Sequence, residues 1–376
     1  MNDSHKQLRI AIIGSGPAGI FAADELLCKR PRTLVDIYER LPAFGGLVRY
    51  AVAPDHPQTR RVMKLFEATL AKPGVALKLG IEIGRDISVA ELRQKYDAVI
   101  VATGAEEDRK LGIPGEALPN AIPSTAFCGW INGDPDFANL DINLEVETAI
   151  VIGNGNVALD CARLLARSQS ALAQTDIARA ALEKLSTRKI RRIIVLGRRG
   201  PAQNSFGAAE IAEFGTLENC AVSVSPREFP IIGNSEDRIF QSLETLKSFA
   251  TAAPNPAAKT SIEFRFFARP AEIKERAGTP ASLSIERTRL DGERAVGTGA
   301  FEEIPCGLVI KAVGHHGVAL PGLPFDESRG VIPNSGGRIE RGLYCVGWIK
   351  RGASGLIGHN RKDAMETVAL LVADFA

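Results

Sequence analysis

The sequence has 376 residues, of which 45% are apolar and 24% are charged, as in an ordinary globular protein. This length exceeds the size at which a single hydrophobic core keeps growing, so two domains are expected. The 46 basic and 44 acidic residues leave a net charge of +2, which excludes a global field for binding nucleic acid or an anionic membrane.

The N-terminal pattern gives no sign of a membrane span or of a leader peptide, although a chain whose leader had been removed would look the same. The longest apolar run, residues 10–23, is interrupted by three glycines and a proline, so it is a poor membrane span. The first predicted strand starts within about ten residues of Met1, which leaves no room for a targeting segment. We therefore expect a cytoplasmic protein.

The first predicted unit is a strand, a glycine turn, a helix and a second strand. An apolar strand over 8–13 leads into Gly14-Ser-Gly16-Pro-Ala-Gly19, a helix is predicted over 17–27, and a strand over 33–38 ends in Glu39. Such glycines let backbone amides approach a pyrophosphate at a helix N-terminus, and the acid about twenty residues later reaches a ribose hydroxyl. We interpret this as a dinucleotide site for an unphosphorylated ribose, as in FAD or NAD, rather than a chance glycine turn.

Between the two glycine loops the pattern is mixed. Residues 41–57 are rich in glycine and proline and are expected to form a loop, whereas residues 58–70 show helical periodicity with Val62, Leu65, Phe66 and Leu70 on one face. The apolar run 97–103 predicts a buried parallel strand. Residues 112–123 contain five glycines or prolines, which is typical of a connection between domains.

A second strand–glycine–helix–strand unit follows. A strand over 148–152 precedes Gly153-Asn-Gly155-Asn-Val-Ala158, a helix is predicted over 157–167, and the strand over 191–196 is followed by Arg198 and Arg199. Two guanidinium groups at this position select a 2′-phosphate, and hence NADPH. They lie about 45 residues after Gly153 rather than about 20, which requires a helical insertion over 168–189. A solvated basic turn is the alternative interpretation.

The C-terminal third repeats the strand pattern of the beginning. Strand-like segments are predicted over 262–268, 281–290, 308–313 and 342–347, a helix over 356–374, and a surface loop over 252–258. Residues 97–104 and 308–314 share the same pattern, an apolar strand followed by glycine, and this similarity indicates nested domains. We expect a discontinuous first domain, 1–104 and 315–376, with a second domain, 105–314, inserted into it.

The six cysteines bear on where electrons go. They are scattered, with no C-x-x-C and no zinc or iron–sulfur spacing, so no metal site is predicted. A chain that binds both FAD and NADPH but has no disulfide or cluster of its own must use an external acceptor, namely a protein redox carrier, a quinone or oxygen.

Four segments carry a family resemblance. Residues 44–57 (with V-A-P-D-H-P), 153–160, 197–201 and 346–352 (with G-W-I-K-R-G) resemble adrenodoxin reductase and its bacterial ferredoxin–NADP reductase relatives. The resemblance runs from about Leu8 to the C-terminus. It implies an α/β fold of two nested Rossmann-like, three-layer dinucleotide-binding domains, a glutathione-reductase-like architecture, with FAD in the outer domain and NADP in the insert.

The resemblance also implies roles for individual residues. The positions that bind the FAD adenosine and pyrophosphate are matched by Gly14, Ala18, Glu39, Leu47 and Ile83, with Gly16 and Gly19 of the same loop. Those that lie against the flavin ring are matched by Trp348, Gly355, Leu356 and Ile357. Those that bind NADP are matched by Asn154, Gly155, Asn156, Val157, Arg198, Arg199 and Glu210. His56 and Glu213 match a catalytic pair near the nicotinamide, with a structural ion bridge as the alternative. The family's G-P-T-G is Gly352-Ala-Ser-Gly355 here, and His315-His316 is expected in a loop.

The function hypothesis is an FAD-dependent NADPH:ferredoxin oxidoreductase, in which hydride passes from NADPH to flavin N5 and single electrons go to an iron–sulfur protein. An acidic ferredoxin is expected to dock on Arg60, Arg61 and Lys64, or on Lys350 and Arg351. Two alternatives stay open. One is an electron-input module similar to the small subunit of glutamate synthase, and the other is a non-catalytic NADPH sensor.

Overall fold

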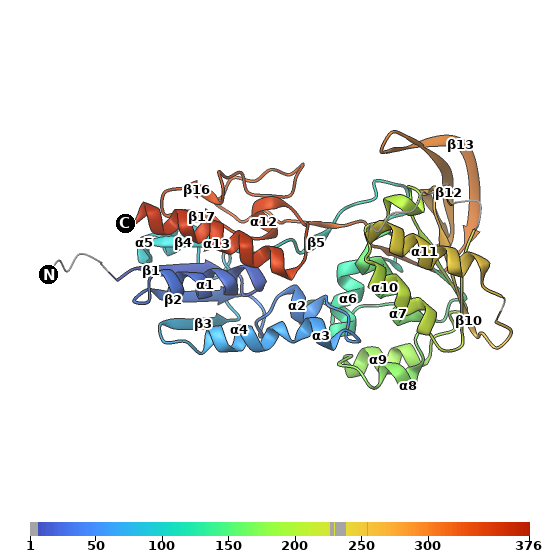
Figure 1. Ribbon diagram of the computed structural model, residues 1–376, viewed down its shortest axis with the longest axis horizontal. Coiled ribbons are helices and arrows are strands. Elements are labelled where there is room, and N and C mark those ends of the chain that lie inside the picture. The colour runs from blue at the N-terminus through green and yellow to red at the C-terminus, as the bar shows by residue number, and fades with distance from the viewer. Residues whose placement is uncertain (1–6, 226–228, 230–237, 254) are drawn as a thin grey trace. The chain divides into compact units, whose positions relative to one another are not determined.

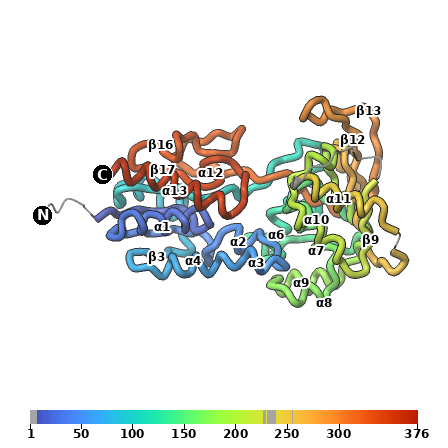
Figure 2. The backbone as a smooth tube through the Cα atoms, viewed as in Figure 1, coloured from blue at the N-terminus to red at the C-terminus, as the bar shows by residue number. Residues whose placement is uncertain are grey.

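Segments that are far apart in the sequence combine into two units. The computed structural model describes residues 7–225, 229, 238–253 and 255–376. Figure 2 shows the N-terminal (blue) and C-terminal (red) parts of the chain within the same unit. Unit 1 comprises Met1–Val52, His56–Glu107 and His315–Ala376, and unit 2 comprises Ala53–Asp55 and Asp108–Gly314.

Two of the places where the chain passes between the units lie at short strands. These are β5 (Glu107–Asp108) and β15 (His315–His316), which pair in a two-stranded sheet. The expectation of a loop at His315 and His316 is therefore wrong. Two residues are too few to show strand periodicity, and their extended conformation comes from pairing with a segment about 200 residues away.

Unit 1 is built on a six-stranded sheet in the order β16-β17-β4-β1-β2-β3 (Figure 1). All neighbouring strands are parallel except β16 and β17, which are antiparallel. The strands are β1 (Arg9–Ile13), β2 (Leu34–Glu39), β3 (Val75–Leu79), β4 (Ala98–Val101), β16 (Arg338–Glu340) and β17 (Leu343–Cys345). The helices are α1 (Pro17–Lys29), α2 (Leu47–Tyr50), α3 (Pro57–Arg60), α4 (Val62–Leu70), α5 (Val89–Lys95), α12 (Trp348–Arg351) and α13 (Ile357–Asp374).

Both faces of this sheet are covered, which explains the continuous apolar strands. On one face Ile10 and Ile12 of β1 pack in a buried cluster with side chains of α1, α4 and α13. On the other face Ala11 and Ile13 pack with Leu92 of α5 and with residues of the 320–349 region. The sheet with a cover on each face gives the three layers that the sequence predicts.

The helix predicted over 58–70 is wrong in detail. It consists of α3 and α4, which meet at Arg61, and the predicted loop before it contains α2. Phe66 is fully buried, but Leu65 is 42% exposed, so the apolar face is narrower than the sequence suggests. Four-residue helices are too short to reveal a 3.6-residue period.

Unit 2 has a parallel six-stranded sheet in the order β6-β14-β7-β8-β10-β9. The strands are β6 (Ala121–Pro123), β7 (Thr148–Ile152), β8 (Arg192–Leu196), β9 (Cys220–Val224), β10 (Thr260–Arg265) and β14 (Leu308–Lys311). The helices are α6 (Ser124–Asn132), α7 (Asn156–Ala166), α8 (Gln169–Leu172), α9 (Arg179–Ser186), α10 (Ala208–Ala212) and α11 (Arg238–Thr251), with single 3₁₀ turns η1 (Pro135–Phe137), η2 (Pro201–Gln203) and η3 (Glu213–Thr216). The helical insertion predicted over 168–189 is confirmed by α8 and α9.

A three-stranded antiparallel sheet covers one face of the parallel sheet in unit 2. Its strands are β11 (Ala268–Arg276), β12 (Thr279–Asp291) and β13 (Arg294–Pro305). Ile273, Leu283 and Ile304 of this sheet share a buried cluster with Ile150 and Ile194 of the parallel sheet. The antiparallel sheet therefore completes the core of unit 2 and supports the loops at the ends of its strands.

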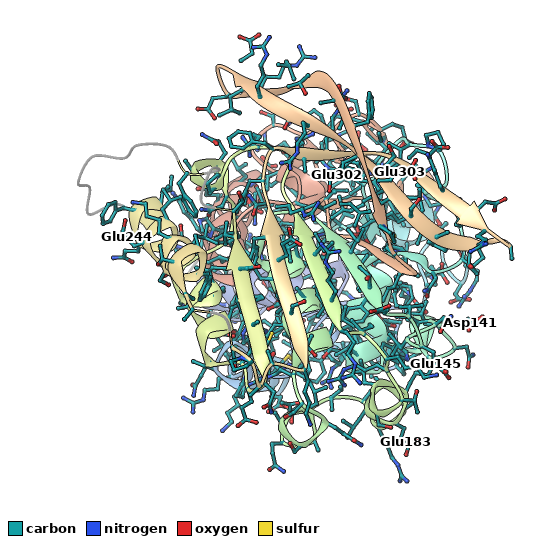
Figure 3. All side chains as sticks on the ribbon, turned by 90° about the vertical axis from the view of Figure 1, so that its right-hand side faces the viewer. Asp141, Glu145, Glu183, Glu244, Glu302 and Glu303 are labelled. Carbon is teal, nitrogen blue, oxygen red and sulfur yellow. The ribbon has the colours of Figure 1, made fainter. Side chains whose placement is uncertain are left out.

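Several acidic residues at the periphery of unit 2 form ion pairs. Figure 3 labels six of them on the surface of this unit. Glu145, Glu183 and Glu244 pair with Lys189, Arg179 and Lys247, respectively. Such exposed pairs contribute little to stability, and they leave this surface without a strong field of one sign. No helix in the described parts of the chain is long and apolar enough to cross a membrane.

Candidate functional site

The first glycine loop connects β1 to α1, as the sequence predicts. Gly14 has a φ of +106°, and a Cβ there would lie 2.5 Å from the Ala102 carbonyl oxygen. A Cβ at Gly19 would lie 2.1 Å from the Gly14 carbonyl oxygen. These two glycines are therefore required by the protein itself, for the turn and for the close approach of helix to strand.

Gly16 is different, because the protein does not require a glycine there. Its φ of −72° suits any residue, and the nearest atom to a Cβ would be the Gly46 Cα at 3.9 Å. Gly16 is the N-cap of α1, so open space lies beside the amides of a helix N-terminus. That space fits a pyrophosphate, which needs close contact with backbone N–H groups.

Glu39 lies beside this loop at the end of β2. Its side chain is buried, and its carboxylate accepts hydrogen bonds from the Ser15 amide at 3.1 Å and the Ser15 hydroxyl at 2.6 Å. The other carboxylate oxygen accepts from the Leu41 amide at 3.0 Å. A carboxylate has about four acceptor positions, so it can hold the loop and still accept a ribose hydroxyl.

Two further predicted FAD residues are brought to the same end of unit 1. Leu47 begins α2 directly after Gly46, and Gly46 packs against Gly16. Ala18 is buried under Gly347, where a Cβ would lie 2.5 Å from the Ala18 Cβ. Ile83, in contrast, is a core residue packed in the cluster that includes Tyr38.

The segment that begins at Gly347 is held by a buried ion pair. Asp363 of α13 accepts from the Gly347 amide and pairs with Lys350 at 2.6 Å. Trp348 donates from its indole nitrogen to the Ser354 carbonyl at 3.0 Å, which closes the loop that leads to Gly355. The Lys350 side chain is only 9% exposed, so its expected use as a ferredoxin contact is wrong.

The end of this loop is open to solvent. Leu356, the N-cap of α13, is 59% exposed, and its amide donates to His359 Nδ1 at 3.1 Å. Ile357 is partly buried against the core of unit 1. An exposed leucine at a helix N-terminus is unusual for an N-cap, and it suits a surface that contacts an apolar ligand face.

The second glycine loop repeats the design of the first. A Cβ at Gly153 would lie 2.1 Å from the Ala312 carbonyl oxygen, so the protein requires this glycine. Gly155, the N-cap of α7, has an ordinary φ of −128° and only the Ser205 Cβ nearby, at 3.9 Å. Open space therefore lies beside the start of α7, as it does beside α1.

Four predicted NADP residues gather around this loop in unit 2. The side-chain amide of Asn156 donates through its nitrogen to the Glu210 carboxylate at 3.0 Å, and its oxygen accepts from the Gly207 backbone amide at 3.1 Å. The Asn154 carbonyl accepts from Ser205, and Val157 is partly buried in the first turn of α7. These contacts join α7 to the start of α10.

Arg198 and Arg199 follow β8 and are positioned by the antiparallel sheet. Thr288 of β12 donates from its hydroxyl to the Arg198 carbonyl at 2.7 Å, and the Phe267 amide donates to the Arg199 carbonyl at 3.1 Å. The Arg198 side chain is exposed, and Arg199 makes only a loose pair with Glu293, at 4.0 Å. Both guanidinium groups are therefore accessible to an anion.

Glu213 forms an ion pair that the sequence did not reveal. Its carboxylate lies 3.2 Å from Nε of Arg163, which also binds Asp55 and Asp160. The predicted partner His56 is the N-cap of α3 in unit 1. The sequence contained two hints at this cluster, since Asp55 directly precedes His56 and Asp160 and Arg163 are three residues apart on one helix.

Two cysteines that are 33 residues apart in sequence lie together. The sulfur atoms of Cys128 and Cys161 are 4.0 Å apart, on α6 and α7, which the sequence spacing does not show. The hydrogen bond with Cys128 and burial raise the pKa of Cys161 well above its ordinary value. A protonated, inaccessible thiol is a poor nucleophile, so this pair is no disulfide-exchange centre.

Thiol labelling should distinguish one cysteine from the other five. Cys28 is exposed and the rest are buried, and burial raises the pKa of Cys220 to about 11 and of Cys306 and Cys345 to about 12. At pH 8 an aromatic disulfide reagent should label one thiol per native chain, at least ~100-fold faster than the others, and all six in denaturant. Any fast-reacting thiol in a native Cys28→Ser variant would contradict this.

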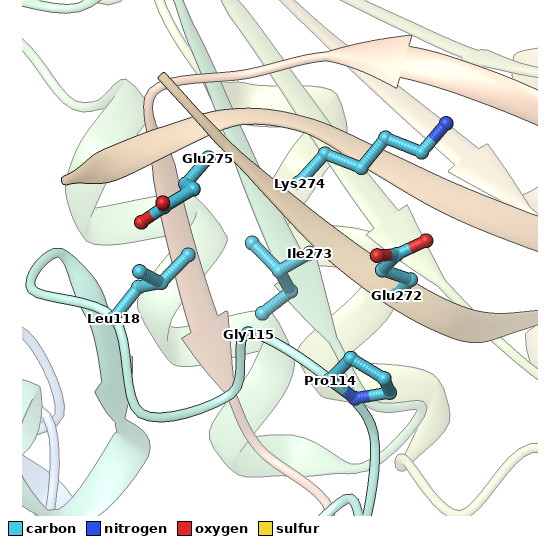
Figure 4. Close-up of a pocket in the computed structure, with 7 residues that line it drawn as sticks. All are labelled: Pro114, Gly115, Leu118, Glu272, Ile273, Lys274 and Glu275. Atoms are coloured by element: carbon cyan, nitrogen blue, oxygen red, sulfur yellow. The ribbon is translucent and has the colours of Figure 1, made fainter. Parts of the chain in front are cut away.

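A shallow pocket elsewhere in unit 2 has none of these features. It lies between β11, through Glu272–Glu275, and the connection that carries Pro114, Gly115 and Leu118 (Figure 4). A Cβ at Gly115 would lie 2.0 Å from the Ile273 carbonyl oxygen. The pocket thus marks where the connection packs on the antiparallel sheet, and it contains no predicted site residue.

A family model decides the classification. The model of the pyridine nucleotide-disulphide oxidoreductase family matches residues 8–347. The chain belongs to this family. The α/β fold and the two dinucleotide-type loops are in keeping with that assignment, and the predicted fold class is confirmed.

Relatives and solved structures extend the match. The chain is 42% identical to the NADPH-ferredoxin reductase FprA of Mycobacterium tuberculosis, over 96% of this chain and 83% of the relative. It is 39% identical to the human mitochondrial NADPH:adrenodoxin oxidoreductase, over 98% and 79%. The structure of M. tuberculosis FprA in complex with NADPH has a TM-score of 0.95 at 41% identity, covering 98% of this chain and 85% of FprA. The resemblance to the adrenodoxin reductase family is confirmed.

Proposed function

We propose that the chain is an FAD-dependent NADPH:ferredoxin oxidoreductase, which takes hydride from NADPH and delivers single electrons to an iron–sulfur protein. The observation that carries the proposal is the contrast between the two glycine loops. The first lies beside the buried carboxylate of Glu39, and the second belongs to the unit that presents Arg198 and Arg199. One loop suits the unphosphorylated ribose of FAD and the other the 2′-phosphate of NADPH.

The relatives support this assignment. Their names join NADPH with ferredoxin in one case and with adrenodoxin in the other, and both of these acceptors are iron–sulfur proteins. One solved relative is a complex with NADPH, and another is a histidine-to-glutamine variant of the same enzyme. We include a cytoplasmic location in the proposal.

The residues of unit 1 fit FAD. The open space at Gly16 would admit the pyrophosphate, Glu39 would accept from the ribose, and the segment from Trp348 to Ile357 would lie against the flavin ring. When bound, the flavin supplies the ability to accept two electrons as hydride and to release them singly. The N-terminus of α13 would place the positive end of a helix dipole beside the ring.

The residues of unit 2 fit NADPH. Gly155 would admit the pyrophosphate, and Arg198 and Arg199 would bind the 2′-phosphate. Asn156 and Glu210 are joined by a hydrogen bond at 3.0 Å, so together they form a fixed polar wall at the start of α7. Glu213 would orient the nicotinamide.

The proposal is tested by purification and turnover. The chain should purify with about one FAD per chain and should reduce a ferredoxin with NADPH far faster than with NADH. A colourless protein that does not take up FAD would overturn the proposal. Rapid reduction of ferricyanide without any ferredoxin reduction would favour an electron-input module, and bound FAD without turnover would favour a sensor.

A further inference from the structure

A buried cation, the guanidinium group of Arg163, lies within unit 2. The side chain lies on α7 and is 1% exposed, and so is Asp55, to which it is bound. Nε donates to one Asp55 oxygen at 2.8 Å and Nη2 to the other at 2.9 Å, so the pair is bidentate. Nη2 also reaches Asp160 at 2.8 Å.

Two more charged side chains complete the cluster. Arg167, one turn further along, donates to Asp55 at 2.6 Å, and Glu213 lies 3.2 Å from Nε of Arg163. Burial alone would lower the pKa of Arg163, but the hydrogen bonds that it donates to Asp55 and the charge of Asp160 raise the pKa above its ordinary value. Arg163 is therefore held as a cation by three carboxylates.

Two of the carboxylates that contact Arg163, those of Asp55 and Glu213, lie at or next to candidate site residues. Asp55 is the last residue of the short segment Ala53–Asp55, which belongs to unit 2, and His56 follows it directly. Glu213 is the other member of the candidate pair and is 39% exposed, so it is accessible to a ligand. One guanidinium group thus contacts both Asp55 and Glu213.

The planar shape of the guanidinium makes this arrangement specific. Its Nε and Nη2 donors form a rigid fork that fits the two oxygens of Asp55, and this fixes the plane in which Glu213 can approach Nε. A lysine ammonium is a point charge that cannot keep both geometries. An ion cluster with only a structural role would not need Glu213, since Asp55 and Asp160 already pair with Arg163.

We propose that Arg163 is the positioning residue of Glu213: its guanidinium group, fixed in plane by Asp55, orients the Glu213 carboxylate. This inference rests on the proposed function, in which Glu213 orients the nicotinamide. It predicts that Arg163 affects the rate of hydride transfer and leaves the binding of NADP⁺ intact, because Arg198 and Arg199 supply the phosphate contacts.

The test compares Arg163→Lys with Arg265→Lys in the FAD-loaded protein. Arg265 is a matched control, since it is 15% exposed and pairs with Glu263 and Glu302 in the same unit. Anaerobic stopped-flow mixing with NADPH gives the limiting rate of flavin reduction, and calorimetry gives the affinity for NADP⁺. We expect Arg163→Lys to slow the limiting rate roughly 10- to 100-fold with NADP⁺ affinity within about threefold, and Arg265→Lys to change both by less than about twofold.

A double-mutant cycle distinguishes a positioning role of Arg163 from a purely structural one. In the Glu213→Gln background, Arg163→Lys should slow reduction by less than about twofold, because a residue that acts through the Glu213 carboxylate has no effect once that carboxylate is removed. Equal slowing by Arg163→Lys in both backgrounds, or a limiting rate in the single variant equal to that of the unsubstituted protein, would overturn the inference.

A second variant serves if Arg163→Lys does not fold. Asp55→Asn keeps the shape of the side chain but weakens the bidentate contact that fixes the plane of the Arg163 guanidinium group. The limiting rate should therefore fall about tenfold, again without an effect in the Glu213→Gln background. An unchanged rate would overturn the inference while the proposed function stands. If NADPH does not reduce the flavin of the unsubstituted protein, the proposed function fails and the inference falls with it.

Discussion

A valine at Gly16 should give a folded protein that no longer retains FAD. The backbone at Gly16 is extended, with φ −72° and ψ −178°, and valine adopts this conformation without strain. The protein leaves the space around a Cβ open, so the added methyl groups would occupy the volume assigned to the pyrophosphate. We expect FAD per chain to fall more than about tenfold, because the phosphates can no longer reach the amides at the start of α1.

The matched control is a valine at Gly155, which has the same kind of environment in unit 2. This variant should keep its FAD and lose NADPH affinity, so the pair of substitutions separates the two loops. Flavin absorbance per chain measures the first effect, and NADP⁺ titration by calorimetry measures the second. Full FAD retention in a folded Gly16→Val protein, or FAD loss in Gly155→Val, would show that the loops have been assigned the wrong ligands.

The two glycine loops are the part of the molecule that the sequence predicts best. Each combines a buried strand, a turn that needs positive φ and a helix within about 30 residues, and all of these signals are local. The structure gives β1 and α1 at the predicted positions, and it gives β7 and α7 likewise. The sequence could not show that Gly14 and Gly153 are required by the protein whereas Gly16 and Gly155 are open, because that distinction depends on backbone from distant strands.

The charged cluster around Arg163 shows where sequence reasoning ends. Arg163 and Asp55 are 108 residues apart, and nothing in the periodicity of α7 indicates that an arginine on it is buried, since arginine is ordinarily exposed. The same limit applies to the antiparallel sheet. Strand β13 was not predicted, because its exposed residues lack the alternation that marks a half-buried strand. The Arg163 cluster and the antiparallel sheet both depend on contacts between residues far apart in the sequence, and not on local propensity.

The arginine loop combines both kinds of information. The sequence shows the two arginines, but it does not show the hydrogen bonds that hold their backbone in place. The Arg198 and Arg199 carbonyls are held by Thr288 and Phe267, which lie about 70 to 90 residues later in the chain. Because the backbone is fixed by these bonds, both guanidinium groups are presented at the end of β8 without a strong ion pair of their own.

Replacing Arg198 and Arg199 together with alanine should therefore convert a strong preference for NADPH into a weak one. Each guanidinium makes charge-assisted bonds to the 2′-phosphate, so their joint loss should lower kcat/KM for NADPH on the order of 10²- to 10³-fold. For NADH, which lacks this phosphate, kcat/KM should fall less than about threefold. The backbone bonds from Thr288 and Phe267 do not involve the arginine side chains, so the variant should fold and keep its FAD.

The control removes the same charge from another part of unit 2. Arg179→Ala with Lys184→Ala on α9 changes the net charge equally, and the Arg179 side chain is 91% exposed. If the arginines act only by steering an anionic cofactor, both double variants should weaken NADPH to a similar extent, and added salt should abolish the difference from the unsubstituted protein. If they bind the 2′-phosphate directly, only the Arg198 and Arg199 variant loses discrimination, and the ratio of the two kcat/KM values stays low at every salt concentration. An equal loss for NADPH and NADH would instead mean that the loop supports the fold of unit 2, and the assignment of the second site to NADPH would have to be abandoned.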